Sequence, residues 1–563
     1  MIRPVLVVAL LAWGCASPVE EGPEGQRHEV VEAVPLPPTA HLIRAAMALT
    51  GTRPPLADLQ AVAADPAALP TAIDRLLEQP QFGETIRDLH AESLLLRWDL
   101  LLLPHVGILA ERGVDRAAVN RSVMEAPLRL IERVVMEDRP YGEIVTAPTT
   151  MADRIVADVW GLPYDDAAGG WQEVRWSDGR PAAGILSSSA MWLRHRSAGF
   201  NLHRERANVL SRALLCWDFL DRDLPIDGSV DLSDPRAVAR AVVANPDCAA
   251  CHVTLDPLAS YLSIFRPLVV EPLVTGYPIA MYQPERADDW IATTGRPPGF
   301  FGDVGGDLAE LGRKIAADPR FSLCAARRFL GWFAGMDPME VPHEEAAALQ
   351  AVFVESGQSA KALARAAVLS PFLAASHVED EAEAAALTGY KKARPEQLAR
   401  LFEDLTGFRW EVEIPFEVGG APFGTVDLAR SDLFGYRALA GGIDGYFVTV
   451  PARTMSTSAS LFLRRYAARA AGHVVEADFA TSDPAARRML RRVEPGGLDE
   501  AAARAQLVDL HLRLYGEVLA PDDVPITESW SILRAVHGRT GDVRHAWKTL
   551  LTAMLQDVKI AYY

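Results

Sequence analysis

Apolar residues recur three and four positions apart along most of this chain, which is the spacing that lines one face of an α-helix. In residues 39–49 such a stripe follows Thr39, which is suited to cap a helix, and precedes Gly51. The same signals predict further helices over residues 72–77, 84–103, 114–136, 209–220, 233–245, 256–265, 320–335, 359–369 and 395–405, and from 456 to the C-terminus. The pattern therefore predicts a mainly α-helical protein.

Two short segments show strand-like signals instead. Trp171, Val174 and Trp176 precede the turn signal Ser177-Asp178-Gly179, and apolar and acidic residues alternate over 410–418 before Gly419-Gly420. We expect a small β-hairpin at each place. Pro415 would confine its strand to a sheet edge, because proline cannot donate to a neighbouring strand.

The N-terminus is typical of an export signal. Arg3 provides a positive charge before the apolar run 5–13, which is too short to span a bilayer. The segment that ends at Cys15 resembles an imperfect bacterial lipobox, so we expect lipidation of Cys15 after cleavage. The alternative is ordinary cleavage near Gly14 or Ala16, which would release a periplasmic protein. In either case the protein is exported, as a periplasmic or an outer-membrane-anchored lipoprotein.

Composition and charge argue against some classes of binding partner. The chain has 563 residues, with 56 Lys and Arg against 74 Asp and Glu, for a formal net charge of −18. It contains no long basic run, and so many acidic groups would repel a phosphate backbone. Nucleic-acid binding is therefore not expected. Beyond the first 15 residues no stretch is long and apolar enough to span a bilayer, so membrane contact is expected only through the N-terminal lipid anchor.

The segment Cys248-Ala249-Ala250-Cys251-His252 carries the clearest chemical signal. Two thiols and an imidazole at this C-x-x-C-H spacing attach haem c: the thiols of Cys248 and Cys251 bond to the porphyrin, and His252 ligates the iron. A zinc site would need four ligands, and no second close Cys/His pair completes one. A thioredoxin-like site needs a strand before the motif, which the flanking residues do not provide. We therefore expect one covalent haem c, with His252 as the proximal iron ligand.

Five cysteines occur in the whole chain, and two remain after lipidation and haem attachment are assigned. These are Cys216 and Cys324. An exported protein meets an oxidising compartment, so we predict a disulfide between them that closes a loop around the haem motif. The alternative is a pair of buried free thiols that behave as small apolar side chains.

Several segments together resemble the planctomycete-type cytochrome c-like proteins, whose constituent domains are mostly of unknown function. The resemblance is carried by residues 49–55 and 76–84 near the N-terminus, by 184–216, by the motif segment 248–265 and by 324–329. It covers most of the chain but concentrates between about 180 and 375. The resemblance implies a secreted or cell-envelope protein with haem c, and it implies little about a substrate.

The sixth iron ligand would decide the function. A strong protein ligand makes an electron carrier, whereas an open position allows chemistry on a small molecule. His195 and His203 are both candidates for the distal ligand, because both precede the segment that the predicted disulfide draws toward the motif. His195 is placed first. The leading hypothesis is a cell-envelope c-type cytochrome-like lipoprotein that transfers electrons to a redox or envelope partner protein, and no catalytic residue is assigned. The alternatives are a haem peroxidase-like enzyme and a non-catalytic envelope scaffold or binding protein.

The expected architecture is a mainly α, multi-domain protein with a central cytochrome c-like module and small β-hairpin insertions. From the N-terminus, the expected parts are a signal peptide with a lipobox at 1–15, a flexible tether at 16–38, a helical domain at 39–180, a haem c-like domain at 181–377, a linker at 378–394 and a C-terminal helical domain at 395–563.

Overall fold

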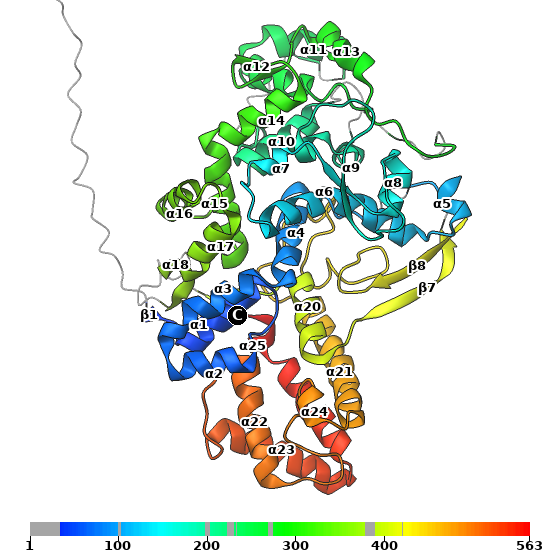
Figure 1. The fold of residues 1–563 in the computed structure, drawn as a ribbon. Coiled ribbons are helices and arrows are strands. Elements are labelled where there is room, and N and C mark those ends of the chain that lie inside the picture. The colour runs from blue at the N-terminus through cyan, green and yellow to red at the C-terminus, as the bar shows by residue number, and fades with distance from the viewer. Residues whose placement is uncertain are drawn as a thin grey trace, which may run out of the picture.

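Helices make up most of the computed structural model, which confirms the predicted mainly α fold (Figure 1). The structure describes residues 34–99, 103–196, 203–221, 230–231, 233–267, 269, 274–377, 389–418 and 420–563. Cys15 with the whole predicted signal peptide, most of the predicted tether and most of the predicted linker lie outside these residues. Among the described residues, no helix combines the length and apolar character needed to cross a bilayer.

The N-terminal third is mainly helical. Its helices are α1 (Pro38–Leu49), α2 (Leu56–Ala64), α3 (Leu69–Leu77), α4 (Pro80–Leu94), α5 (Ile108–Glu111), α6 (Arg116–Met136), α7 (Glu143–Thr146) and α8 (Arg154–Trp160). Within this part α2, α3 and α4 pack on the buried helix α1, and α6 packs along α4. The helices predicted over 39–49, 72–77 and 114–136 correspond to α1, α3 and α6.

The central part contains the motif segment and the helices that support it. These are α9 (Ser189–Arg194), α10 (Arg204–Leu215), α11 (Pro235–Ala244), α12 (Pro246–Ser260), α13 (Ala287–Thr294), α14 (Leu308–Ala317), α15 (Pro319–Ala334), α16 (His343–Glu355), α17 (Ala360–Leu369) and α18 (Pro371–Ala374). α11, α12 and α13 lie together at one end of the molecule (Figure 1). α10 packs against both α12 and α15.

The C-terminal part forms the opposite end of the molecule (Figure 1). It consists of α20 (Pro395–Thr406), α21 (Thr457–Ala480), α22 (Glu500–Tyr515), α23 (Val524–Thr540), α24 (Val543–Leu555) and α25 (Val558–Ala561). The chain then returns to α1, where the Thr39 hydroxyl donates to the Gly516 carbonyl at 2.8 Å and the Arg53 side chain donates to the carbonyls of Leu514 and Lys559. The two ends of the described chain are therefore packed together.

The described strands form only two-stranded antiparallel pairs. β1 (Val34–Pro35) pairs with β6 (Ala375–His377), β2 (Thr150–Ala152) with β3 (Gln172–Val174), β4 (Gly299–Phe300) with β5 (Asp303–Val304), and β7 (Glu411–Val418) with β8 (Ala421–Asp427). The hairpin predicted around Gly419-Gly420 is therefore present. Its register shifts between Ile414 and Glu417, at Pro415.

The prediction of a hairpin that turns at Ser177-Asp178-Gly179 is wrong. β3 lies before that turn, but it pairs with β2, twenty residues upstream, in the register Thr150 opposite Val174. Asp178 instead accepts hydrogen bonds from the Arg180 guanidinium, which also stacks on the Trp176 ring at 3.6 Å. The predicted strand before the turn is present, but it pairs with an earlier strand and not with a segment after the turn.

Two helices end earlier than the apolar pattern predicts, and both end at a residue in the left-handed region. α4 stops before Leu95 (φ 51°) rather than continuing to residue 103, and α10 stops before Cys216 (φ 50°). Beyond this break Trp217 and Leu220 are exposed, so they do not share the buried face predicted over 209–220. The spacing of apolar residues predicts which face of a helix is buried, but it does not predict the residue at which the helix ends.

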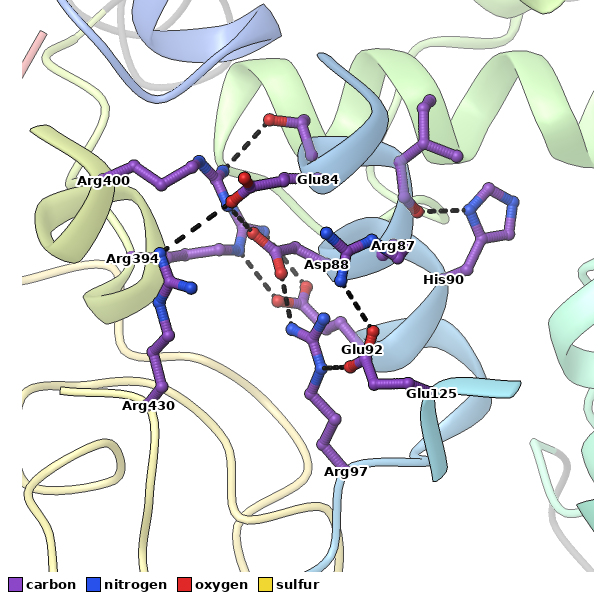
Figure 2. A network of polar contacts seen from close by, with 12 residues as sticks. Glu84, Arg87, Asp88, His90, Glu92, Arg97, Glu125, Arg394, Arg400 and Arg430 are labelled. Atoms are coloured by element: carbon purple, nitrogen blue, oxygen red, sulfur yellow. Dashed lines mark hydrogen bonds and ion pairs between the residues drawn. The ribbon is translucent and has the colours of Figure 1, made fainter. Parts of the chain in front are cut away.

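A buried network of charged side chains joins the N-terminal helices to α20 (Figure 2). Arg400 of α20 and Arg97 both form ion pairs with Asp88 of α4, and Arg97 also donates to Glu125 of α6 at 2.7 Å. Arg87 completes the set by donating to Glu125 at 2.8 Å. Segments about 300 residues apart in sequence thus share one set of ion pairs.

The carboxylates of this network are held in their charged form. Burial opposes the ionisation of Glu125, but Arg97 and Arg87 outweigh burial and lower its pKa to about 2. Burial likewise opposes the ionisation of Asp88, and Arg400 and Arg97 lower its pKa well below the usual range. Removing one partner of such a buried ion pair destabilises the fold much more than replacing both partners with apolar residues, because it leaves an unpaired charge in the interior.

Candidate haem-attachment site

The motif lies in the first half of α12. Asn245 caps this helix, because its side chain accepts from the backbone N–H of Asp247 at 2.9 Å, and Pro246 occupies the first helical position, where its missing N–H is not needed. The prediction that Asp256-Pro257 opens a separate helix is wrong, since α12 continues through Pro257 to Ser260. The Asp256 carboxylate does not cap a helix; it has other partners.

The helical backbone places the motif side chains on one side of α12. Cys251 follows Cys248 by three positions and His252 follows it by four, and residues three and four apart are neighbours on a helix surface. Cys251 is buried, Cys248 is half-buried and the His252 side chain keeps 20% of its surface exposed. Cys248 and His252 are therefore partly accessible from outside, whereas Cys251 faces the protein interior.

His252 is held by a buried carboxylate one helical turn away. Its Nδ1 lies 3.0 Å from Oδ1 of Asp256, whose side chain is 1% exposed. Arg204, in the first turn of α10, grips the same carboxylate with two hydrogen bonds: Nε donates to Oδ1 at 2.6 Å and Nη2 donates to Oδ2 at 3.0 Å. This is a two-pronged guanidinium–carboxylate contact, the geometry that orients a carboxylate best.

The ionised carboxylate determines which nitrogen of His252 carries the proton. Burial raises the pKa of Asp256, but hydrogen bonds from His252 and Arg204 outweigh burial and lower the pKa below its usual value. An ionised carboxylate can only accept hydrogen bonds, so Nδ1 of His252 must be the donor. In the neutral imidazole the lone pair is then on Nε2, the atom available to a metal.

Trp290 of α13 makes further contacts that hold Asp256 and Arg204 in place. The Trp290 indole N–H of α13 donates to the Asp256 carbonyl at 2.9 Å, and the Arg204 guanidinium lies over the Trp290 ring at 5.1 Å. On the next turns of the chain, Leu258, Tyr261, Leu262 and Phe265 are buried in the hydrophobic core. α12 is thus fixed on its inner side.

The two distal candidates lie in different surroundings. His195 is buried at the end of α9, and its Nε2 donates to the Leu94 carbonyl of α4 at 2.8 Å. Burial and the neighbouring Arg194 lower its pKa well below the usual value. His195 is thus a neutral side chain tied to the backbone of α4, and no contact joins it to the motif.

His203 lies beside the residues that support the motif helix. It is the cap residue of α10, directly before Arg204, and its ring meets the Trp290 ring edge-on at 5.6 Å. Burial, Arg206 and Arg286 lower its pKa to about 3. His203 therefore contacts the Trp290 support of the site, although no contact with His252 is present.

Arg204, Asp256 and Trp290 were not predicted from the sequence. The spacing of Asp256 four residues after His252 was the one available signal, because it places both side chains on one helix face. Arg204 and Trp290 come from other helices, 52 and 34 residues from Asp256, so only the tertiary structure shows them.

The structure brings together the two cysteines that the sequence left for a disulfide. The sulfur atoms of Cys216 and Cys324 lie 2.11 Å apart, at the distance of a disulfide bond. Cys216 follows the end of α10, and Cys324 lies in α15. The bond joins α15 to the helix that carries Arg204 at its other end.

The donor set of the motif fits haem c. Two thiols and one oriented imidazole are what its attachment and proximal ligation need, since the porphyrin would bring its own ring nitrogens as ligands of the iron. Among the described residues no group of three or more His, Cys, Asp or Glu side chains is arranged to hold a bare metal ion.

Comparison with known proteins adds no relative to this description. No family model, no curated protein and no solved structure matches the chain.

Proposed function

We propose that this protein is a c-type cytochrome-like protein of the cell envelope that carries one covalent haem on α12 and transfers electrons to a partner protein. Cys248 and Cys251 form the two thioether bonds, and His252 is the proximal ligand. The observation that carries the proposal is the contact between His252 Nδ1 and Asp256 at 3.0 Å. It leaves Nε2 as the metal-facing atom on the same helix side as both thiols.

The Asp256–Arg204 pair has a defined role in this proposal. Histidine ligands of metals commonly donate their second N–H to a carboxylate, which fixes the ring and makes the ligand more basic. Asp256 is that carboxylate, and Arg204 orients it through two hydrogen bonds. When bound, haem c supplies a one-electron iron couple, and these residues position its proximal ligand and tune its basicity.

Export is part of the same proposal, because haem c is attached outside the cytoplasm in bacteria and the N-terminus has the features of an export signal. Lipidation at Cys15 would hold the protein at the membrane, with residues 16–38 as the tether. Its partner is then a redox protein in the same compartment.

The experiment is expression in a host that matures c-type cytochromes, followed by a pyridine haemochrome spectrum and intact mass. We expect a c-type spectrum and a mass increment of about 616 Da, one iron porphyrin. Cys248→Ala with Cys251→Ala should give colourless protein of bare mass. His252→Ala should lose most haem, whereas the control His545→Ala, at an exposed residue of α24, should retain it.

The spin state then separates electron transfer from catalysis. A six-coordinate, low-spin spectrum that cyanide does not change at millimolar concentration supports an electron carrier. A five-coordinate, high-spin spectrum with peroxide turnover would make the protein a haem enzyme instead. Colourless wild-type protein at its bare mass would overturn haem attachment altogether.

A further inference from the structure

A cavity of about 550 Å³ lies where α4, α10, α15 and the loop 449–453 meet. This volume is in the range of small-molecule sites, which run from roughly 300 to 1,000 Å³. The residues that line it include Cys216 but none from α12. The cavity is therefore separate from the candidate haem-attachment site.

Four arginines line the cavity, and they fall into two classes. Arg394 pairs with Glu92 at 2.8 Å, and Arg453 pairs with Glu340 at 2.6 Å. Arg212 and Arg328, by contrast, form no ion pair with any described residue. Arg328 donates only to backbone carbonyls, from Nε to Ala213 at 2.8 Å and from Nη2 to Arg212.

These two unpaired guanidinium groups repel each other. Burial and the positive charge of Arg212 lower the pKa of Arg328 to about 10. Two like charges in a partly buried place are unfavourable unless an anion joins them. A bound oxyanion would remove this repulsion and would accept hydrogen bonds from both.

The acidic residues of the lining have other hydrogen-bond partners or face solvent, although the charges of Asp337 and Glu92 partly offset the repulsion at Arg328. Glu92 is held by Arg394. Asp218 accepts from Asn208 at 2.9 Å and from a backbone N–H, and Asp337 accepts from the backbone N–H of Met339. Asp221 is exposed. None of them forms an ion pair with Arg212 or Arg328.

One of the lining residues also carries a buried hydrogen-bond donor without a partner. Trp332 is 4% exposed and lines the cavity, yet its Nε1 has no hydrogen-bond partner among the described residues. A buried donor without an acceptor is unfavourable, so such groups in native proteins commonly have a ligand or water as partner.

The edge of the cavity is apolar and accessible. Leu220, Met339 and Val450 all line it, and they are 72%, 54% and 61% exposed. Large apolar side chains that gather at an exposed pocket mark a binding surface. The cavity thus combines unpaired cationic donors with an apolar wall.

We propose that this cavity binds an organic anion with an apolar body, whose oxyanion group contacts Arg212 and Arg328 and whose body lies along Leu220, Met339 and Val450. Carboxylates and phosphates share the required head-group chemistry. The proposal is independent of haem attachment.

The test is isothermal titration of the full chain with octanoate, octyl phosphate, acetate and 1-octanol. Octanoate or octyl phosphate should bind saturably at one site, and the stronger of the two identifies the head group. Acetate lacks the body and octanol lacks the charge, so each should bind at least about tenfold more weakly. Arg212→Gln and Arg328→Gln should each weaken binding by about tenfold or more.

The control is Arg539→Gln, which removes the same charge at an exposed residue of α23 far from the cavity and should leave binding unchanged. Arg328 also bonds two carbonyls, so if Arg328→Gln fails to fold, Arg212→Gln decides. The proposal is overturned if neither amphipathic anion binds saturably, if octanol binds as tightly as octanoate, or if Arg212→Gln binds like wild type.

Discussion

Asp256 connects three side chains, two through its buried carboxylate and one through its backbone carbonyl. It accepts from His252 of its own helix and from Arg204 of α10, and its backbone carbonyl accepts from Trp290 of α13. The motif histidine is therefore oriented by residues that carry no motif signature. Whether or not haem is bound, this carboxylate holds the motif helix to its neighbours.

At the residue scale, Asp256→Ala should lower the free energy of unfolding by about 3 kcal/mol, because it leaves the largely buried Arg204 without its anion. Urea unfolding followed by circular dichroism measures this change. Asp288→Ala, at an exposed residue of α13, is the matched control and should change stability by less than about 0.5 kcal/mol. Equal effects of the two substitutions would contradict the structural role of Asp256.

In the haem-loaded protein, Asp256→Asn should raise the reduction potential, by an amount on the order of tens of millivolts. The neutral amide accepts a weaker hydrogen bond from His252 Nδ1, so the imidazole becomes less basic and stabilises the oxidised iron less. Spectroelectrochemical titration measures the potential. An unchanged potential in a variant with full haem content would show that Asp256 does not act through His252.

At the scale of elements, α4 and α10 end where the apolar pattern does not predict an end. α10 stops at Cys216, and the bond to Cys324 then holds this end against α15. The N-terminal end of α10 carries Arg204. One helix therefore links the disulfide, the cavity lined by Arg212 and the carboxylate that orients His252.

The double substitution Cys216→Ser with Cys324→Ser should lower the free energy of unfolding by roughly 2–4 kcal/mol. The bond closes a loop with a sequence separation of 108 residues, so its loss releases a large ensemble of unfolded conformations. Chemical denaturation with and without reductant measures the effect. Reductant should destabilise wild type and leave the double variant unchanged; destabilisation of both would assign the effect to another group.

At the scale of the whole molecule, the buried network around Asp88 joins helices from both halves of the chain (Figure 2). Asp88 and Glu125 have lowered pKa values in the folded protein. Such groups contribute stability that is fully present above their unfolded pKa, near 4, and is lost as pH falls toward the folded value.

Stability should therefore fall steeply between about pH 5 and pH 2, with Glu125 alone accounting for about 3 kcal/mol of the loss. Urea midpoints measured across this range test the slope. Asp88→Asn should lower stability at pH 7 and flatten the acid dependence. The control Asp522→Asn, at an exposed residue, should preserve both. A pH slope that Asp88→Asn leaves unchanged would contradict the role of the network.

The units expected at 39–180, 181–377 and 395–563 are joined by many contacts. α1 packs on α15 and α17, α2 packs on α22, and Arg394 before α20 reaches Glu92 of α4. A sequence reports composition shifts along the chain, but it does not report which distant helices share a core.

The sequence alone determined the mainly helical fold, the positions of helices such as α1, α3 and α6, the hairpin at 411–427 and the C-x-x-C-H motif, because each of these depends on residues close together in the chain. It also singled out Cys216 and Cys324 as a pair by elimination. The sequence did not predict that the motif itself lies on a helix. Only the tertiary structure decided the partner of β3, the ends of α4 and α10, the grip of Arg204 on Asp256 and the cavity with two unpaired arginines. Each of these depends on contacts between segments that are far apart in the sequence, and a local sequence pattern does not predict such contacts.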